Sequence, residues 1–380
     1  ETLSQTLEHN VKLKRFIDEN IKYKRLFDIS LHLEGLPRNI GIHASGIVMS
    51  CKDIDETVPL YKNNRGIYTT AYSMNYLEPL GLLKMDFLGI SNLTLIQEVL
   101  TKIRENENLN ITFQNIPLDD KKTLDIFRKV KTDGIFQFES TGMRRFLEKL
   151  QASSFDDIIA ALALYRPGAM DFIDNYIRRK NGEEPIEYPH PSLEKILKPT
   201  YGIIIYQEQI MQIARTLANY TLSEADLLRR AMSKKKFDIL KQEEEKFING
   251  CISNGYSYEA SKKVYDHILA FANYGFNKSH SVAYSIVSYK MAYLKAHFPK
   301  FFYSNLLEGV VGSEIKTLDY IKELKKLDIK VLAPDINLSL EKKYKVVDNG
   351  IIMPLSVIKN VGGIIAHYIV EERKKGEYKD

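Results

Sequence analysis

Cysteine is scarce in this sequence and long apolar runs are missing, and each shortage excludes a class of protein. The two cysteines, Cys51 and Cys251, form no CxxC or paired Cys/His spacing, which excludes a disulfide framework and disfavours a structural zinc site. No run of roughly 18 apolar residues occurs, so no membrane span is expected. The absence of a P-loop or Rossmann fingerprint disfavours a phosphate-binding metabolic enzyme.

The ends of the sequence and its length suggest a piece of a larger cytoplasmic protein. The first residues are polar, with no methionine start and no signal peptide, and the last residues directly follow a helical pattern. These features predict an excised fragment. With 380 residues, 44% apolar and 27% charged, the chain is long enough for two or three soluble domains.

Positive charge is concentrated in one part of the chain. The formal net charge is +5, but residues 195–300 alone hold 16 Lys and Arg against nine Asp and Glu, a net of +7. A polyanion such as nucleic acid favours such a segment, because each neutralised phosphate releases counterions. An ordinary solvated basic surface has the same composition, so charge alone leaves both interpretations open.

Hydrophobic periodicity predicts an α+β chain that is predominantly helical. Residues 1–34 show helical spacing, and three β-rich runs at 46–50, 66–70 and 81–89 predict a small sheet. Further helices are predicted from residue 92 onward, at 92–105, 119–130, 141–150, 154–164, 206–219, 223–234, 236–254, 257–272, 281–297 and 314–326. A strand pair at 343–353 and a glycine hairpin at 361–363, between two helical stretches, complete the pattern.

Asp86 lies in the third predicted strand. Because strand side chains alternate, Lys84, Asp86 and Leu88 share one face, and Met85 and Phe87 on the other face can pack a core. A carboxylate on the open face can bind a divalent metal, since hard cations prefer oxygen ligands. The alternative is an exposed strand aspartate paired with Lys84.

Five cations lie within eight residues at the end of the predicted helix 223–234: Arg229, Arg230, Lys234, Lys235 and Lys236. They repel one another unless an anion is near, and triphosphate or nucleic-acid phosphate would serve. Cations that complement the helix dipole are the alternative. Ser223, with Asp226 three residues later, resembles a capping box for this helix.

Segment 274–281 has a glycine turn that feeds the predicted helix 281–297. Free N–H groups at a helix start favour anions, so Lys278 and His280 would lie where a phosphate can dock. For His280, capping or packing is the alternative.

Two other residues and one hairpin are candidates with weaker signals. Tyr206 follows an apolar run and can stack on a base, although a buried hinge tyrosine fits equally well. Arg166 lies in an Arg-Pro-Gly turn that is uninformative alone. The hairpin Val361-Gly362-Gly363 can offer N–H groups to a DNA phosphate, as a helix-hairpin-helix does, although glycine turns between helices are common.

Taken together, these segments carry a specific resemblance. Seven motifs occur in one order: Arg38-Asn39 with His43 to Gly46, Lys84 to Gly89, Gly134 to Ser140, Tyr165 to Gly168, Tyr201 to Gln209, Leu228 to Met232, and Tyr274 to Ser281. In these motifs the chain resembles the catalytic α subunits of bacterial DNA polymerase III, the C-family of replicative polymerases, most closely the DnaE-type branch. The resemblance covers essentially all 380 residues.

The resemblance implies a fold of a partial palm, with a small β-sheet, and a large helical fingers domain. Residues 1–34 would be the end of the thumb, 35–90 the second part of the palm, and 91–350 the fingers. Residues 351–380 would start the helix-hairpin-helix region. In this family three aspartates hold two Mg²⁺ ions. The resemblance makes Asp86 the third of these metal ligands and a catalytic residue, with Lys84 beside it.

The resemblance also implies binding residues and partners. Candidates for the incoming nucleotide are Arg166, Tyr206, Gln207, Arg229, Arg230, Lys234, Asn277, Lys278 and His280. Candidates for DNA are Arg38, His43, Lys235, Lys236, Gly362 and Gly363. The implied partners are primer–template DNA, dNTPs and, in the full-length protein, the sliding clamp and other replisome subunits, with no membrane partner.

The sequence also departs from the family pattern. The Asp-x-Asp motif that supplies the other two aspartates is absent, since Asp53-Ile54-Asp55 has the spacing but not the context. The PHP domain, the first palm part, the clamp-binding segment and the OB domain are missing as well. We therefore expect this chain to be inactive alone. A helical nucleic-acid-binding module without catalysis is the competing hypothesis.

Overall fold

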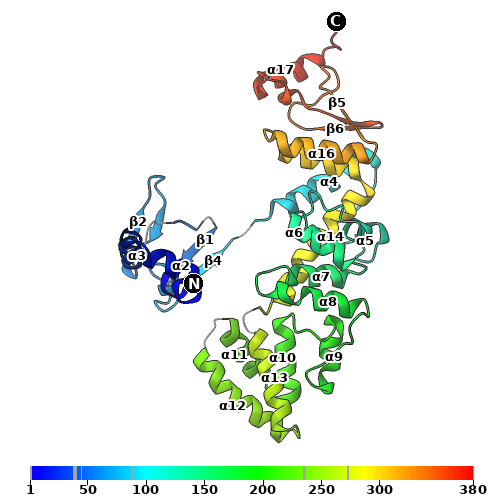
Figure 1. The fold of residues 1–380 in the computed structure, drawn as a ribbon. Coiled ribbons are helices and arrows are strands. Elements are labelled where there is room, and N and C mark those ends of the chain that lie inside the picture. Colours follow the sequence, from blue (N-terminus) through cyan, green and yellow to red (C-terminus); the bar gives the residue numbers. More distant parts are fainter. Residues whose placement is uncertain are drawn as a thin grey trace. The chain divides into compact units, whose positions relative to one another are not determined.

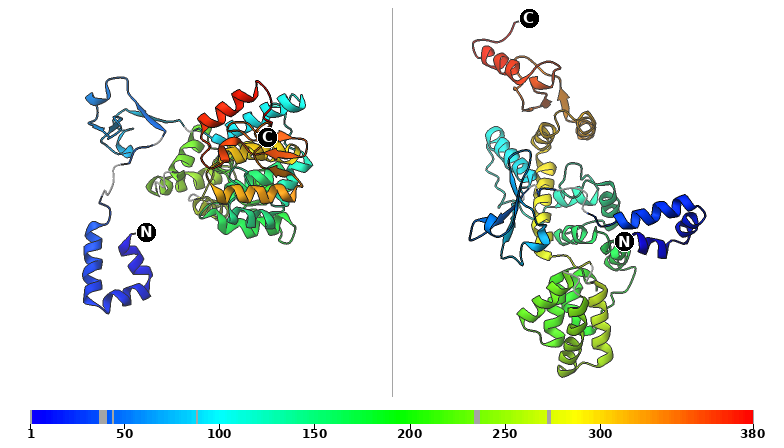
Figure 2. Two further views of the ribbon diagram at one scale, coloured as in Figure 1. Left: turned by 90° about the horizontal axis from the view of Figure 1, so that it is seen from above. Right: turned by 90° about the vertical axis from the view of Figure 1, so that its left-hand side faces the viewer.

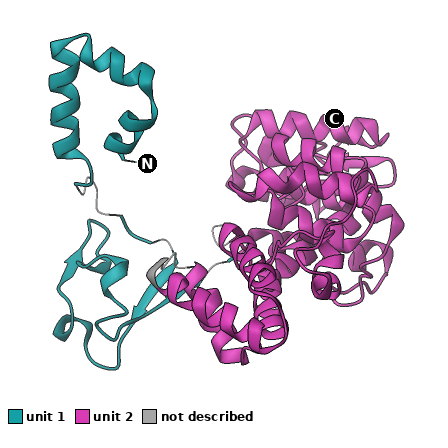
Figure 3. Ribbon diagram, turned by 60° about the horizontal axis from the view of Figure 1, so that its bottom comes forward, with its two compact units in different colours: residues 1–89 teal, residues 90–380 magenta. Residues whose placement is uncertain are grey.

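The computed structural model describes residues 2–36, 41–43, 45–87, 89–233, 237–271 and 274–379. These residues are mainly helical, with small sheets, and they form two compact units, residues 1–89 and 90–380, coloured separately in Figure 3. Within the described ranges, no helix has both the length and the apolar character that crossing a membrane requires.

Unit 1 begins with three helices where the sequence predicted one helical segment. They are α1 (Leu3–His9), α2 (Val11–Asp18) and α3 (Ile21–Leu33). The Asn10 side chain accepts a hydrogen bond from the backbone N–H of Leu13, and Asn20 does the same for Lys22. Asparagine is a strong N-cap because its side chain satisfies a free N–H of the first turn. Each asparagine therefore starts a new helix and divides the segment.

The strands of unit 1 form two separate ladders, whereas the sequence predicted one small sheet. Strand β1 (Gly46–Met49) pairs antiparallel with β4 (Leu83–Asp86), and β2 (Leu60–Lys62) pairs antiparallel with β3 (Tyr68–Thr70). The buried apolar cluster of this unit is small and consists of Val58, Leu77 and Leu82.

The prediction that Met85 and Phe87 pack a core is wrong. Their exposed fractions are 43% and 59%. Strand alternation does place them on the face opposite Asp86, but Met85 lies across from Ile47, which is itself 54% exposed. A two-stranded ladder has too few neighbours to cover both faces.

Unit 2 contains the remaining helices and one further sheet. The helices are α4 (Ser91–Glu107), α5 (Lys121–Arg128), α6 (Thr141–Leu150), α7 (Phe155–Leu164), α8 (Ile173–Lys180), α9 (Glu194–Leu197), α10 (Gln207–Ala218), α11 (Leu222–Ser233), α12 (Phe237–Ser253), α13 (Tyr258–Phe271), α14 (Lys278–His297), α15 (Pro299–Gly309), α16 (Glu314–Lys326) and α17 (Gly363–Arg373). The sequence analysis missed α8, α9 and α15. It placed the others within a few residues of their observed bounds.

Two apolar cores hold unit 2 together. The larger core surrounds α14, which contacts α4, α5, α7 and α15. The second core lies inside a lobe formed by α9 to α13. Figure 1 shows this lobe below α7 and α8, and the right-hand view of Figure 2 shows it as a green body next to the yellow α14.

A three-stranded sheet follows α16. Its order is β5 (Lys330–Leu332), β7 (Gly350–Ile352), β6 (Lys345–Val347), with β5 parallel and β6 antiparallel to β7. The hairpin of β6 and β7 lies where the sequence predicted a strand pair. Strand β5, like β2 of unit 1, was not predicted.

Candidate functional site

Asp86 ends strand β4, opposite Gly46 of β1. The Lys84 ammonium donates a hydrogen bond to the Asp86 carboxylate, and this bond is the main reason that the pKa of Asp86 is lowered. Nε2 of His43 lies 3.9 Å from Oδ1 of Asp86. Lys84, Asp86 and His43 therefore form one group, whereas the sequence paired only Lys84 with Asp86 and gave His43 as a candidate DNA contact.

Gly46 makes this group possible. A Cβ atom at position 46 would lie 2.9 Å from Oδ1 of Asp86 and 2.9 Å from Nδ1 of His43. Real Cβ atoms do not come so close, so any larger residue would push the two side chains away.

The described residues do not by themselves fit a site for two Mg²⁺ ions. Among them, no group of three or more His, Cys, Asp or Glu side chains is placed to hold a metal. Asp86 offers a single carboxylate, and an ammonium group is hydrogen-bonded to it. Mg²⁺ sites normally combine one or two protein carboxylates with substrate phosphates and water.

In unit 2, several of the motifs meet around one pocket of about 560 Å³. Its lining includes Gln137, Glu139, Tyr165, Arg166, Phe276, His280 and Tyr284. These residues come from the turn before α6, the end of α7, the segment before α14 and the first turns of α14. The fold thus brings together three sequence stretches that are far apart in the chain.

Stacked rings connect the walls of this pocket. The Arg166 guanidinium lies over the Phe276 ring, 4.5 Å from its centroid. Phe276 meets His280 edge-on at 5.5 Å, and His280 stacks on Tyr284 at 4.2 Å. Arg166 and His280 are both exposed, so a cation and an imidazole line an open, aromatic-walled pocket.

The segment before α10 lies alongside the segment before α14. Tyr206 and Phe276 form a parallel β-bridge, and the Gln207 side chain donates to the carbonyl of Gly275 at 3.0 Å. Tyr206 is only 4% exposed, and burial raises the pKa of its hydroxyl. The Lys278 ammonium lies 5.4 Å from the centre of the Tyr206 ring. The fold therefore gathers Tyr206, Gln207 and Lys278 at one place.

The start of α14 is not open to an anion as the sequence suggested. The backbone N–H of Lys278 donates to the Glu208 carboxylate, at 2.9 and 3.0 Å, and that of His280 donates to Asn277 Oδ1 at 2.8 Å. The anion at this helix start is thus a side chain of the protein itself. Asn277 caps the helix, and its start moves from residue 281 to Lys278.

The arginines of α11 have acidic neighbours that the sequence analysis did not pair with them. Asp226 forms ion pairs with Arg229 at 2.8 Å and with Arg230 at 2.7 Å. The capping box predicted at Ser223 and Asp226 is wrong. Thr221 and Glu224 form that box instead: each accepts a hydrogen bond from the other's backbone N–H.

Several candidates lie elsewhere or outside the described residues. His43 is in unit 1, whereas Gly362 caps α17 and Gly363 is its first residue, both in unit 2. A Cβ atom at Gly363 would lie 2.9 Å from the Lys342 side chain. Four candidates fall outside the described residues, namely Arg38, Lys234, Lys235 and Lys236.

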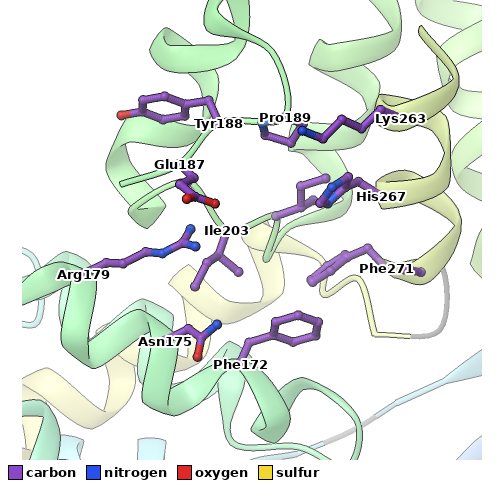
Figure 4. Close-up of a pocket in the computed structure, with 13 residues that line it drawn as sticks. Phe172, Asn175, Arg179, Glu187, Tyr188, Pro189, Ile203, Lys263, His267 and Phe271 are labelled. Carbon is purple, nitrogen blue, oxygen red and sulfur yellow. The ribbon is translucent and has the colours of Figure 1, made fainter. Parts of the chain in front are cut away.

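Another pocket, of about 290 Å³, lies between α8 and α13 (Figure 4). Arg179 and Glu187 are on one side, and Lys263 and His267 of α13 are on the other, with Ile203 between them. Arg179 is held by an ion pair with Glu184 at 3.0 Å. Gly202, Ile203 and Ile204 of the Tyr201–Gln209 motif line this pocket, but none of the candidate catalytic, nucleotide-binding or DNA-binding residues does, so we do not regard it as the candidate site.

Five of the pocket residues named above were not candidates from the sequence: Gln137, Glu139, Tyr165, Phe276 and Tyr284. Gln137 has a left-handed backbone, with φ of +65°, which no sequence pattern announces for glutamine. Phe276 and Glu139 belong to two motifs recognised in the sequence, Tyr274 to Ser281 and Gly134 to Ser140. Membership in these motifs was the signal that could have identified them as site residues.

Comparison with known proteins covers nearly the whole chain. Residues 92–255 match the family described as bacterial DNA polymerase III alpha subunit finger domain. Residues 1–89 match the bacterial DNA polymerase III alpha NTPase domain, whose limit coincides with that of unit 1. Residues 328–380 match a helix-hairpin-helix motif.

Two curated relatives illustrate the similarity. DNA polymerase III subunit alpha of Bacillus subtilis is 44% identical over 379 residues, and that of Staphylococcus aureus (strain MRSA252) is 46% identical over 368 residues. These alignments cover 100% and 97% of this chain, but only 34% of each relative. The chain thus spans about a third of the length of the curated relatives that it matches. Over its whole length, the chain belongs to the family of bacterial DNA polymerase III alpha subunits.

Proposed function

We propose that this chain is part of a bacterial replicative DNA polymerase, in which its helical unit binds the incoming dNTP during template-directed DNA synthesis. The observation that carries the proposal is the pocket where Arg166, His280 and the turn at Gln137 converge. A guanidinium matches phosphate oxygens through paired hydrogen bonds. The aromatic rings beside it suit a base or a sugar.

Two cations near this pocket support a triphosphate ligand. They are Lys278 and Arg229, and they lie with Gln207 on the side where the 206–209 and 274–278 segments meet. Glu208 now accepts the N–H of Lys278, so a phosphate would have to displace that carboxylate or bind beside it. We propose Arg166 and His280 as the primary contacts. Further proposed contacts are Lys278, Asn277, Gln207, Tyr206, Arg229, Arg230 and Lys234, the last of which lies outside the described residues.

Replacing Arg166 tests this pocket. In the full-length polymerase subunit, Arg166→Ala should raise the KM for dNTPs about 10- to 100-fold, because a hydrogen bond to a charged group contributes about 1.5–3 kcal/mol. Arg104→Ala, which removes an exposed arginine of α4, is the control and should leave the KM unchanged. Equal KM values for the two variants in steady-state primer extension would refute the pocket as the nucleotide site.

We also propose that Asp86 is one of three aspartates that hold two Mg²⁺ ions in the full-length subunit. The described residues lack the other carboxylates, so the chain alone should not extend a primer. The hydrogen bond from Lys84 lowers the pKa of the Asp86 carboxyl. The other ligands would come from the part of the polymerase outside this chain.

Asp86→Asn in the full-length subunit tests this role and separates a polymerase from a binding module. Primer extension should fall about 1,000-fold or more, while the affinity for primer–template stays the same. Asp53→Asn, an exposed aspartate of the same unit, should keep full activity. Full activity of Asp86→Asn would favour a nucleic-acid-binding module without catalysis.

The proposed DNA contacts and partners follow from the same family. We propose that Gly362 and Gly363, at the start of α17, offer backbone groups to duplex DNA, because this region matches a helix-hairpin-helix motif. Arg38, His43, Lys235 and Lys236 are further proposed DNA contacts. The cytoplasm, with a sliding clamp and other replisome subunits, is the setting that we propose for the full-length protein.

A further inference from the structure

Helix α14 takes part in the pocket at two places along its length. Its first turns carry His280 and Tyr284, which line one wall. Farther along, Ser288 and Lys295 bind the segment of residues 131–139, whose Gln137 and Glu139 also line the pocket. One helix therefore contacts two parts of the pocket lining.

Lys295 makes the contact that is hardest to explain by packing. It is only 5% exposed, and its ammonium donates to the carbonyl oxygens of Lys131 at 2.6 Å and Asp133 at 2.8 Å. Burying an ammonium is costly, and an apolar side chain of similar length would fill the space without that cost. The ammonium also lies 5.3 Å from the centroid of the Tyr303 ring, but its two hydrogen bonds go to these carbonyls, so they are what Lys295 holds in place.

The segment that Lys295 holds is tightly tied at several further points. The Ser288 hydroxyl donates to the Phe136 carbonyl, and the Thr132 hydroxyl donates to the Phe138 carbonyl, each at 2.7 Å. Asp133 also pairs with Arg144 at 2.6 Å. These contacts enclose Gln137, whose φ of +65° costs about 1 kcal/mol or more for a residue other than glycine. The ties thus keep a strained residue at the pocket wall.

We propose that Lys295 is a positioning residue for the nucleotide pocket: it holds the 131–139 segment so that Gln137 and Glu139 form the pocket wall, without touching the nucleotide itself. This inference rests on the proposed function of the pocket. Charged groups around Lys295 come from several elements: Asp133 and Lys131 of the held segment, Arg144 of α6, and Glu323 of α16.

The test is Lys295→Met in the full-length polymerase subunit, assayed by steady-state primer extension. The KM for dNTPs should rise about tenfold while kcat changes less than threefold, because a displaced wall weakens nucleotide binding. Backbone amides of residues 134–139 should exchange hydrogen faster in this variant. If the variant does not fold, Ser288→Ala, which removes the tie to Phe136, should give the same pattern with a smaller effect.

Lys300→Met is the matched control. Lys300 of α15 also donates to two backbone carbonyls, those of Val347 and Asp348, at 3.2 Å each, but it does not touch the pocket segment. Its dNTP KM should remain at the wild-type value. An equal rise in KM for both lysine variants would mean a general loss of stability and would overturn the proposal.

Arg166→Ala separates failure of this inference from failure of the proposed function. If Arg166→Ala raises the dNTP KM and Lys295→Met does not, Lys295 is not a positioning residue, although the pocket still binds nucleotide. If neither variant changes the KM, both the pocket assignment and the role of Lys295 are wrong.

Discussion

Lys295 is a buried cation behind the lining of the candidate site and is only 5% exposed. Burial lowers the pKa of its ammonium from 10.5 to about 8, and Asp133 and Glu323 oppose that shift only in part. Between these two pH values the unfolded chain binds a proton that the folded chain does not. The contribution of Lys295 to the free energy of unfolding therefore increases as the pH rises from about 8 toward 10.5.

This linkage predicts a pH-dependent difference between the wild-type chain and Lys295→Met. From pH 7 to pH 9.5 the wild type should gain about 1–2 kcal/mol in free energy of unfolding relative to the variant, since each pKa unit corresponds to about 1.4 kcal/mol. Urea denaturation at both pH values measures it. Cys251 and buried tyrosines away from Lys295, such as Tyr265, shift stability the other way, but equally in both proteins. Parallel pH profiles would show that burial does not lower the pKa of Lys295.

Individual site residues were predictable where they belong to a recognised sequence motif. Arg166, Lys278 and His280 were selected from motifs, and the structure brings them near one pocket. Lys295 was not selected, because one lysine in an otherwise helical pattern looks like an exposed position. Its burial depends on the carbonyls of residues 131 and 133, which are far away in sequence.

At the scale of elements, the turn after α7 is pressed against the segment that leads into α14. A Cβ atom at Gly168 would lie 2.1 Å from the Tyr274 ring, and the backbone there has φ of +89°. Both the contact and the conformation require glycine. The turn that holds Arg166 and the segment that holds Phe276 are thus fitted to each other.

Gly168→Ala should therefore destabilise unit 2 by about 2–4 kcal/mol, from backbone strain plus the clash with Tyr274. Gly255→Ala is a matched control, since Gly255 has φ of +90° but nothing within 4 Å of an added Cβ. In that variant the free energy of unfolding should fall by about 1 kcal/mol, because only the backbone strain destabilises it. Urea unfolding compares the two, and equal losses would mean that Tyr274 moves aside freely.

Element boundaries were predictable where capping and periodicity agree. Helix α10 lies within one residue of the predicted span, but α14 starts three residues early because Asn277 caps it. Helix α15 was missed because only Phe298 separates it from α14, and its residues 301–307 are all buried, so they give no alternation of apolar and polar faces. A helix that is buried on several sides lacks the periodic alternation of apolar and polar residues from which helices are predicted.

At the scale of the whole chain, the two units have very different cores. Unit 1 buries a cluster of three apolar residues, whereas unit 2 has two large clusters. Stability grows with the apolar surface that is removed from water. Unit 1 also exposes large apolar side chains such as Val11, Ile21 and Leu83.

The chain should therefore unfold in two steps. Unit 1 should lose structure at low urea concentration and unit 2 at a higher one, because only unit 2 has extensive cores. Circular dichroism, with hydrogen exchange to assign each step, measures the two transitions. Residues 90–380 expressed alone should show only the second. A single transition for the whole chain would mean that unit 1 is as stable as unit 2.

The double role of α14 has an evolutionary consequence. Successive residues of a helix are turned by about 100° and raised by 1.5 Å, so Tyr284 and Lys295 keep their relation only at this separation. Inserting or deleting a single residue between them would rotate Tyr284 away from the 131–139 segment that Lys295 holds. We therefore expect relatives to keep the length of this stretch unchanged.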